Sequence, residues 1–222
     1  MNWSASVVAH NEGTQPDGTS RLRTWLQHWK PLCQELVVVL HNCDDDSACI
    51  CAELGVVPIQ INISGLMESL LWEPPLFARP DVWHWRTGGV DEFVSADCLK
   101  RAEAAILANP DVRLYWVGRE NFCDGADISH LLGTDWQVAL MLPQPLSYEF
   151  KGGMHNYPEI KLHASSVGMM DPNVCWIEHR RTFAEIERCN RSREGFCSPQ
   201  TVQAQDRFIE QVRQAIAGKG KA

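Results

Sequence analysis

The sequence lacks the features of several common protein classes. Its 20 lysines and arginines stand against 28 aspartates and glutamates, which gives a formal net charge of −8. Nucleic-acid binding needs a basic surface that neutralises phosphates, so this balance argues against a nucleic-acid partner. No stretch approaches the roughly 18 consecutive apolar residues of a membrane span. The segment after Met1 has no basic residues before its short apolar run, so we expect no signal peptide and a cytoplasmic protein.

Glycine-rich phosphate loops and zinc-type cysteine pairs are absent as well. The polar loop at 11–20 holds only Gly13 and Gly18, and neither a P-loop pattern nor G-x-G-x-x-G occurs. A nucleotidyltransferase, or another nucleotide-binding enzyme, therefore stays only an alternative. The nine cysteines include no C-x-x-C pair, and Cys49-Ile50-Cys51 has no partner pair at zinc-site spacing. We expect reduced, mostly buried thiols.

The first half of the chain alternates apolar runs with amphipathic ones. The runs at 4–9, 35–40 and 56–63 predict strands, and the patterns at 20–29 and 48–54 predict helices between them. The segment ELVVVL at 35–40 is apolar on both faces, which is typical of a central parallel strand. This order predicts an α/β fold with a mostly parallel central sheet flanked by helices.

The second half has a less regular pattern. It predicts a helix at 97–108, strands at 112–117 and 135–142, extended chain at 161–167 and a final amphipathic helix at 199–217. A chain of 222 residues suits one α/β domain and is short for two, so we predict a single domain.

Polar clusters follow the first two predicted strands. His10 and Glu12 follow the first strand, and Asn42, Asp44 and Asp46 follow the second. The carboxyl ends of parallel strands form the ligand crevice of open α/β sheets, so these side chains are candidates for binding a base or a ribose. The alternative is ordinary loop chemistry, because Asp46 is also a good N-cap for the following helix.

Two adjacent carboxylates, Asp91 and Glu92, follow the aromatic run WHWR. Apolar neighbours on both sides indicate partial burial, which makes unpaired carboxylates costly and favours a hard cation such as Mg²⁺ or Mn²⁺. The alternative is a solvated helix start. Far along the chain, His179 could complete a metal site with Asp91, although a lone histidine is more often structural. Arg180 and Arg181 could neutralise a diphosphate.

The order of these segments resembles the GT-A-type glycosyltransferases of the family 2-like group. The resemblance is carried by HNEG with the following helix RLRTWLQHW, by LVVVLHNCDDDS, by VDEFV and by the late histidine. It covers roughly residues 4–100 and touches again near 161–180. It implies a single GT-A-like (Rossmann-like) domain over 1–222, with a nucleotide-binding half at 1–100 and an acceptor-side half at 101–222 that includes the C-terminal helix. The implied activity moves a sugar from a nucleotide-sugar donor to a hydroxyl of a glycan or small acceptor, assisted by Mn²⁺ or Mg²⁺.

The resemblance also assigns roles by position. The nucleotide sugar would be bound by Ala9, His10, Glu12, Asn42, Asp44, Asp46 and Arg180, and the metal by Asp91 and His179. The catalytic candidates are Asp124, Asp127 and Glu120, in a polar stretch after the strand at 112–117, and Glu92, which would either support its loop or face the acceptor. For the polar stretch, a plain Asp- and Gly-rich turn is the alternative.

Two positions depart from the family pattern. Gly89 stands where the first aspartate of the D-x-D motif is expected, and His41 stands at the expected aspartate of the second loop. The loss of a metal carboxylate weakens the cation site. A metal-independent enzyme, or a catalytically degenerate binding protein with the same fold, therefore stays open beside the metal-assisted transferase.

Overall fold

The computed structural model describes residues 1–62, 77–132, 135–141, 148–151, 157–160, 166–171, 173–191 and 199–219. The strands are β1 (Trp3–Ala9), β2 (Glu35–His41), β3 (Ile59–Ile61), β4 (Trp83–Arg86), β5 (Glu92–Phe93), β6 (Leu114–Cys123), β7 (Ala126–Asp127), β8 (Asp135–Met141), β9 (Tyr148–Lys151), β10 (Tyr157–Ile160), β11 (Val167–Met169) and β12 (Trp176–Arg181). The helices are α1 (Arg21–Trp29), α2 (Ser47–Glu53), α3 (Ala96–Ala108), α4 (Ser129–Leu132), α5 (Phe183–Arg191) and α6 (Pro199–Lys219).

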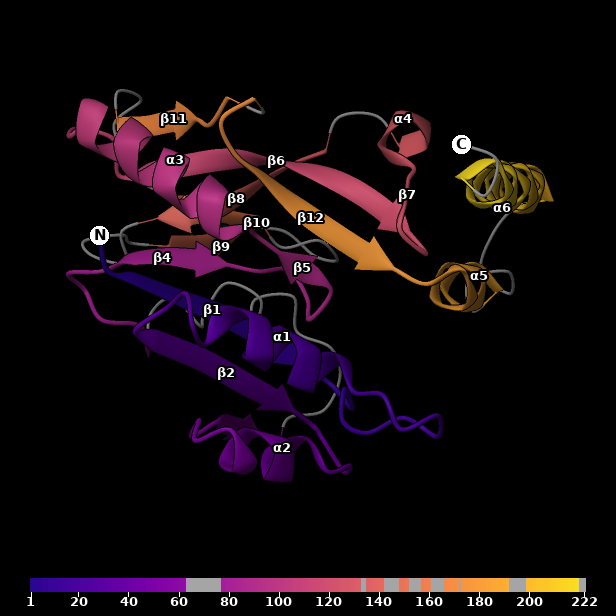
Figure 1. The fold of residues 1–222 in the computed structure, drawn as a ribbon, viewed down its shortest axis with the longest axis horizontal. Coiled ribbons are helices and arrows are strands. Elements are labelled where there is room, and N and C mark those ends of the chain that lie inside the picture. Colours follow the sequence, from indigo (N-terminus) through magenta and orange to yellow (C-terminus); the bar gives the residue numbers. More distant parts are fainter. Residues whose placement is uncertain are drawn as a thin grey trace.

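The main sheet has the strand order β3-β2-β1-β4-β8-β6-β12-β5 (Figure 1), and β7 and β11 also pair with β6. The four strands from β3 to β4 are parallel, which confirms the predicted α/β fold with a parallel sheet in the first half. Beyond β4 the sheet is mixed, because β8 runs antiparallel to both β4 and β6 while β12 runs parallel to β6. It follows that β1, β4, β6 and β12 point the same way and end at one edge.

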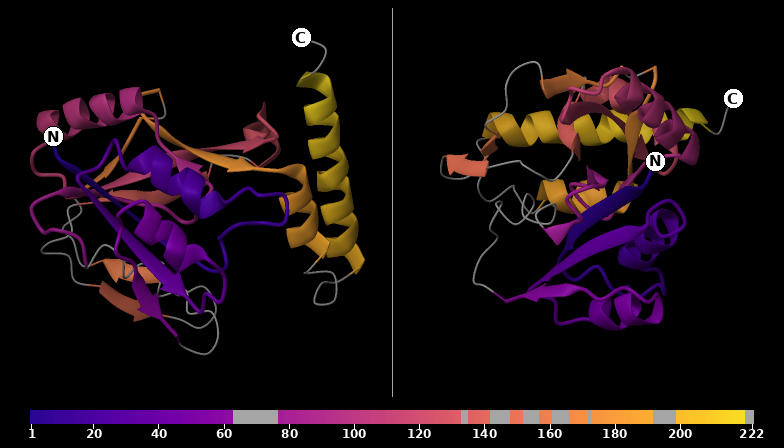
Figure 2. Two further views of the ribbon diagram at one scale, coloured as in Figure 1. Left: turned by 60° about the horizontal axis from the view of Figure 1, so that its bottom comes forward. Right: turned by 90° about the vertical axis from the view of Figure 1, so that its left-hand side faces the viewer.

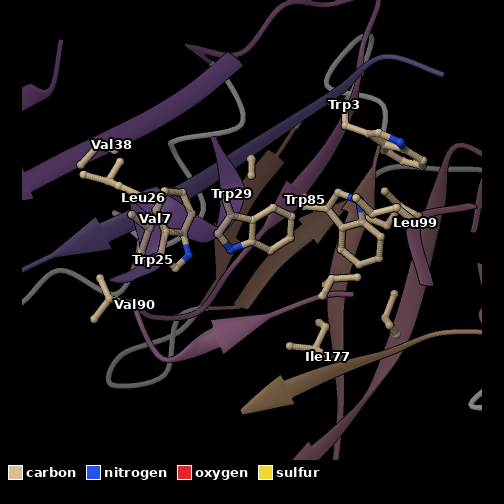
Figure 3. Close-up of a cluster of buried hydrophobic side chains, with 14 of the residues drawn as sticks. Trp3, Val7, Trp25, Leu26, Trp29, Val38, Trp85, Val90, Leu99 and Ile177 are labelled. Atoms are coloured by element: carbon tan, nitrogen blue, oxygen red, sulfur yellow. The ribbon is translucent and has the colours of Figure 1, made fainter. Parts of the chain in front are cut away.

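Helix α1 places a row of aromatic rings under this sheet. The helix begins after Ser20, whose hydroxyl oxygen accepts a hydrogen bond from the Arg23 amide at 3.1 Å. One face is fully buried, and its Trp29 ring lies 6.3 Å from the ring of Trp85 on β4, which in turn lies 6.1 Å from that of Trp3 (Figure 3). Large rings buried in contact contribute strongly to stability, so this cluster fixes α1 on β1 and β4.

Helix α3 covers the other part of the sheet and is tied to it covalently. Ser95 caps the helix by accepting a hydrogen bond from the Cys98 amide at 3.0 Å. Cys98 forms a disulfide with Cys175, just before β12. The expectation that the thiols are reduced is wrong for this pair, because packing of α3 on β12 brings two cysteines far apart in sequence into contact.

Burial raises the pKa of the free thiol of Cys51 to about 11, which keeps it protonated at neutral pH.

The opposite face of β1 and β4 buries a polar group. The His84 ring lies between two serine hydroxyls, with Nδ1 2.7 Å from Ser4 Oγ and Nε2 2.8 Å from Ser6 Oγ. Complete burial lowers the pKa of His84 to about 3, and the charge of Arg86 acts in the same direction. The imidazole is therefore neutral and links the two strands through one donated and one accepted hydrogen bond.

The C-terminal half differs most from the sequence-based expectations. Strand β6 continues to Cys123 instead of ending at 117, because β12 pairs with its second part over 118–123. Strand β12 and helix α5 lie where no element was predicted. The strand expected at 56–63 is confirmed only over Ile59–Ile61, and residue 63 lies outside the described part. The described part of the expected extended segment at 161–167 is residues 166–167, since residues 161–165 are not described.

Helix α6 confirms the predicted C-terminal helix and stands at one end of the molecule, beside α5 (Figure 2). A small apolar cluster separate from the tryptophan core joins it to the sheet. Its buried members are Cys123, Ile128, Ile186 and Val212. Among the described residues, no helix is both long and apolar enough to cross a membrane.

Candidate functional site

A pocket of about 1120 Å³ opens at the edge where β1, β4, β6 and β12 end. Its lining comes from the loop after β1, the start of α1, the segment around β5, the β6–β7 turn, the end of β12 and α5. This is the edge at which open α/β sheets bind ligands. The pocket takes residues from both the 1–100 and 101–222 portions of the chain, so neither portion forms it alone.

The pocket brings together some of the predicted site residues and leaves others outside. The predicted residues that line it are His10, Glu12, Asp91, Asp124 and Arg180. His179 is not part of the lining, but its side chain is hydrogen-bonded to that of Asp91. The predicted residues that do not line it are Ala9, Asn42, Asp44, Asp46, Glu92, Glu120 and Asp127.

The carboxylate of Asp91 is held by two donors from β12. Its Oδ2 atom accepts hydrogen bonds from His179 Nε2 at 3.0 Å and from Arg181 Nε at 3.1 Å. The other ring nitrogen of His179 lies 2.8 Å from the side-chain oxygen of Asn121. Both ring nitrogens of His179 thus have a polar partner, and the contact with the Asp91 carboxylate has Nε2 as its donor. Burial alone would raise the pKa of Asp91, but its contacts with His179 and Arg181 outweigh burial and lower it.

The adjacent carboxylate, Glu92, points away from the pocket. Its side chain is buried, Oε1 accepts a hydrogen bond from Arg119 Nη1 at 3.0 Å, and Oε2 accepts one from the Gly88 amide at 2.6 Å. Asp91 lies in the turn before β5, and Glu92 is the first residue of that strand. The two carboxylates have different hydrogen-bond partners, and the catalytic role expected for Glu92 stays a prediction.

The aspartates after β2 stabilise the loop after β1. Asp45 Oδ2 accepts a hydrogen bond from the Gly13 amide at 2.7 Å, and Asp46 accepts from the amide and hydroxyl of Thr14 at 2.7 and 2.6 Å. These are the local bonds that short polar side chains commonly make in loops. The roles predicted for Asp44 and Asp46 in nucleotide binding remain predictions, and what the structure assigns to Asp46 is support of the neighbouring pocket loop.

Arg21 joins the two walls of the pocket. Its guanidinium forms a bidentate ion pair with Glu12, in which Nε lies 2.7 Å from Oε2, and its Nη1 lies 2.7 Å from Oε1 of Glu185 on α5. Burial alone would lower the pKa of Arg21. The hydrogen bond and charge of Glu12 and the charge of Glu185 outweigh burial and raise this pKa, so the guanidinium is permanently charged. The link crosses 164 positions in the sequence. No local sequence pattern links residues that are so far apart.

Helix α5 begins with a reciprocal cap at the pocket rim. The Thr182 amide donates to Glu185 Oε2 at 2.7 Å, and the Glu185 amide donates to Thr182 Oγ1 at 3.2 Å. Thr182-x-x-Glu185 is the capping-box pattern, a signal in the sequence that would have predicted this helix start. The helix brings Arg188, which sequence analysis missed, to the pocket lining.

The candidate bases lie on the β6–β7 hairpin rather than in a loop. Asp124 sits in the turn with a positive φ of 47°, lines the pocket, and accepts a hydrogen bond from the Phe183 amide at 3.2 Å. Glu120 lies within β6, and burial, followed by the charges of Asp127 and Glu178, raises its pKa. A carboxylate with a raised pKa is a better general base near neutral pH, but Glu120 is not part of the pocket lining.

A divalent cation does not fit the predicted metal residues. Mg²⁺ requires several oxygen ligands at about 2.0–2.1 Å in octahedral geometry. Asp91 is bonded to His179 and to the positively charged Arg181, and Glu92 is bonded to Arg119. Among the residues that the structure describes, no group of three or more histidine, cysteine, aspartate or glutamate side chains could hold a metal ion.

Comparison with known proteins gives a likeness of fold alone. No protein-family model and no curated protein sequence matches the chain. Glucosyl-3-phosphoglycerate synthase from Mycobacterium tuberculosis, in complex with Mg²⁺ and UDP, matches with a TM-score of 0.39 and 15% identity over 56% of this chain and 44% of that one. The complex with Mn²⁺ and UDP-glucose gives a TM-score of 0.40 and 14% identity over 55% and 43%. The matches therefore cover less than half the length of that synthase, which is a GT-A glycosyltransferase.

Proposed function

We propose that the chain is a glycosyltransferase that moves a sugar from a nucleotide-sugar donor to an acceptor hydroxyl, with the donor bound in the pocket at the sheet edge. The observation that supports this most is the set of residues lining that pocket. The segments that carry the family resemblance lie far apart in the sequence, yet His10, Glu12 and Asp91 line one cavity together with Asp124 and Arg180. Its volume lies somewhat above the range of roughly 300–1,000 Å³ of small-molecule sites.

The chemistry assigned to the pocket is a substitution at the anomeric carbon. A new bond forms between that carbon and the acceptor oxygen, the bond to the diphosphate oxygen breaks, and the acceptor proton passes to a carboxylate. Asp124 is the preferred carboxylate because it lines the pocket. Guanidinium groups at the other side of the pocket, on Arg180 and Arg181, stabilise the charge that builds up on the departing diphosphate.

Binding is tested first, by titration calorimetry with UDP, GDP and their glucose and mannose conjugates. We expect one nucleotide to bind and Glu12→Gln to weaken it about tenfold, since a charged hydrogen-bonding group is lost. Glu53→Gln is the matched control, because Glu53 also pairs with an arginine of α1 but lies outside the pocket. Absence of binding across the panel would refute the proposal.

Transfer is tested separately, by release of the nucleoside diphosphate in the presence of a panel of glycans and small acceptors. Asp124→Asn should abolish release and leave nucleotide binding within about twofold, whereas Asp81→Asn, at an exposed site near Arg79, should change neither. The second candidate is a degenerate protein that binds without transfer, favoured by the hydrogen bonds that Asp91 makes with His179 and Arg181. Nucleotide binding without release for any acceptor supports that candidate.

A further inference from the structure

The corner of the pocket around Asp91 already contains positive charge from the protein itself. Its Oδ2 atom bonds to both His179 and Arg181, and the side chain of Asp91 is only 12% exposed. The Oδ1 atom points at Gly89, where an added Cβ would come within 2.6 Å of it. Oδ2 is therefore occupied by two donors, and Oδ1 lies next to Gly89.

A divalent cation bound to this carboxylate would lie close to the imidazole and guanidinium groups that hold it. Like charges at such separations repel strongly where water is excluded. The displaced guanidinium of Arg181 would also lose its partner, which is costly for a partly buried charge. The neighbouring Glu92 offers no compensation, because Arg119 and the Gly88 amide hold it in the opposite direction.

Arg181 is arranged to do the work expected of a metal ion. Only its Nε atom bonds to Asp91, and its two terminal nitrogens bond to none of the residues that the structure describes. The side chain is 41% exposed and lines the pocket. A guanidinium fixed at Nε presents its two terminal nitrogens as a fork, the geometry that binds phosphate oxygens in a bidentate manner.

We propose that this pocket binds the diphosphate of its ligand without a divalent cation, and that Arg181, anchored on Asp91 and assisted by Arg188, takes the place of the metal. The ligand class, a diphosphate, deepens the proposed function and rests on it. Arg188 lines the same pocket and bonds to none of the described side chains. Arg181 and Arg188 come from two successive elements, the end of β12 and α5.

Net charge alone does not attract an anion to this pocket. Six carboxylates line it against four guanidinium groups. Four of those carboxylates are already paired with arginines of the protein: Glu12 and Glu185 with Arg21, Glu178 with Arg180, and Asp91 with Arg181. The anion site is therefore local and directional, made of hydrogen-bond donors in fixed positions rather than of a general positive potential.

Inorganic pyrophosphate is the probe, because it carries the diphosphate without a base or a sugar. Titration calorimetry in excess EDTA should detect pyrophosphate binding to the wild-type chain. The affinity should be at least tenfold weaker in Arg181→Gln and in Arg188→Gln. Arg213→Gln is the matched control, since Arg213 is an exposed arginine of α6 outside the pocket. Arg181→Gln leaves Asp91 with one donor fewer and could disturb folding. Arg188→Gln, which breaks no described bond, keeps the test independent of that effect.

The metal arm uses Mn²⁺ alone, followed by its electron paramagnetic resonance signal. We expect the free-ion signal to be unchanged by the protein. Two results would overturn the proposal while leaving the transferase function in place. One is that the wild type binds Mn²⁺ and Asp91→Asn abolishes this binding. The other is that pyrophosphate binds only when Mn²⁺ is present. The proposal would also be overturned if Arg213→Gln weakened pyrophosphate binding in EDTA as much as Arg181→Gln does. Failure of the nucleotide panel, with pyrophosphate still bound in EDTA, would refute the transferase and retain the arginine site.

Discussion

The two walls of the pocket are stabilised in different ways. The N-terminal wall, made by the loop after β1 and by α1, stands on a core that contains Trp25, Trp29 and Trp85, all fully buried. The C-terminal wall, made by the end of β12 and by α5, stands on a smaller cluster that has four buried side chains among the described residues. What positions it instead is a helix cap and the ion pairs of Arg21 and Asp91. Apolar burial fixes one side of the site, and directional polar bonds fix the other.

The largest effect is expected in the tryptophan core. Trp29→Ala should lower the free energy of unfolding by about 3–5 kcal/mol, because it opens a cavity beneath α1 and removes the hydrogen bond from the indole nitrogen to the Glu92 carbonyl. Urea denaturation followed by circular dichroism measures this. Trp116→Ala is the matched control, since Trp116 is 38% exposed and should cost less than about 1 kcal/mol. Equal losses would remove the contrast between core and surface.

Acidification should weaken the N-terminal region through His84. The unfolded chain protonates this imidazole near pH 6.5, while the folded chain leaves it neutral down to about pH 3. The unfolded state thus binds more protons in this window, so stability falls as pH decreases, by up to about 1.4 kcal/mol per pH unit. Burial lowers the pKa of His28 as well, which acts in the same direction.

The measurement is the free energy of unfolding at intervals between pH 7 and 4.5, for the wild type and for His84→Gln. The variant should have a lower stability at pH 7 and a shallower slope below pH 6.5. A slope that is the same in both proteins would show that His84 is not the group responsible.

In the C-terminal wall, Val212→Ala should cost only about 1–2 kcal/mol, because it removes two methyl groups from a small cluster. Its effect should be local, with faster amide hydrogen exchange in α5 and α6 than in α1. Val57→Ala, at a side chain that is 91% exposed, is the control. Uniformly faster exchange across both walls would mean that the small cluster is part of the main cooperative unit.

The smallest effect is expected for the bond between the walls. Arg21→Gln should lower stability by about 1 kcal/mol at low salt and by less at high salt, because its ion pairs are partly exposed and screened. Arg23→Gln, whose pair with Glu53 is more exposed, should change stability less. Unfolding measured at two salt concentrations separates the two variants. A salt-independent loss for Arg21→Gln would indicate that packing rather than charge is lost.

The first half of the fold could be predicted because its apolar periodicities are local and regular. ELVVVL and the stripe from Leu22 to Trp29 each indicate one element, and parallel order follows from their alternation. The second part of β6 could not be predicted, because it contains the polar run Arg119-Glu120-Asn121 and forms a strand through pairing with β12. Helix α5 carried a signal, its capping box, that periodicity alone does not detect.

The same limit applies to the candidate site. Asp91 and His179, predicted as metal ligands, are hydrogen-bonded to each other, but residue types alone do not distinguish a metal site from a hydrogen-bonded cluster. The deciding facts are the orientation of Arg181, on a strand that was not predicted, and the opposite orientation of Glu92. Neither follows from residue type or spacing.

The disulfide between Cys98 and Cys175 has a practical consequence. The two cysteines are 77 positions apart, and the bond turns the intervening chain, which holds β6, β7 and β8, into a closed ring. A single proteolytic cut within that ring leaves every residue covalently attached, so the nicked protein migrates as one species until a reductant is added. Limited proteolysis should therefore be analysed with and without reductant, and fragments seen only after reduction will map the cuts that lie between the two cysteines.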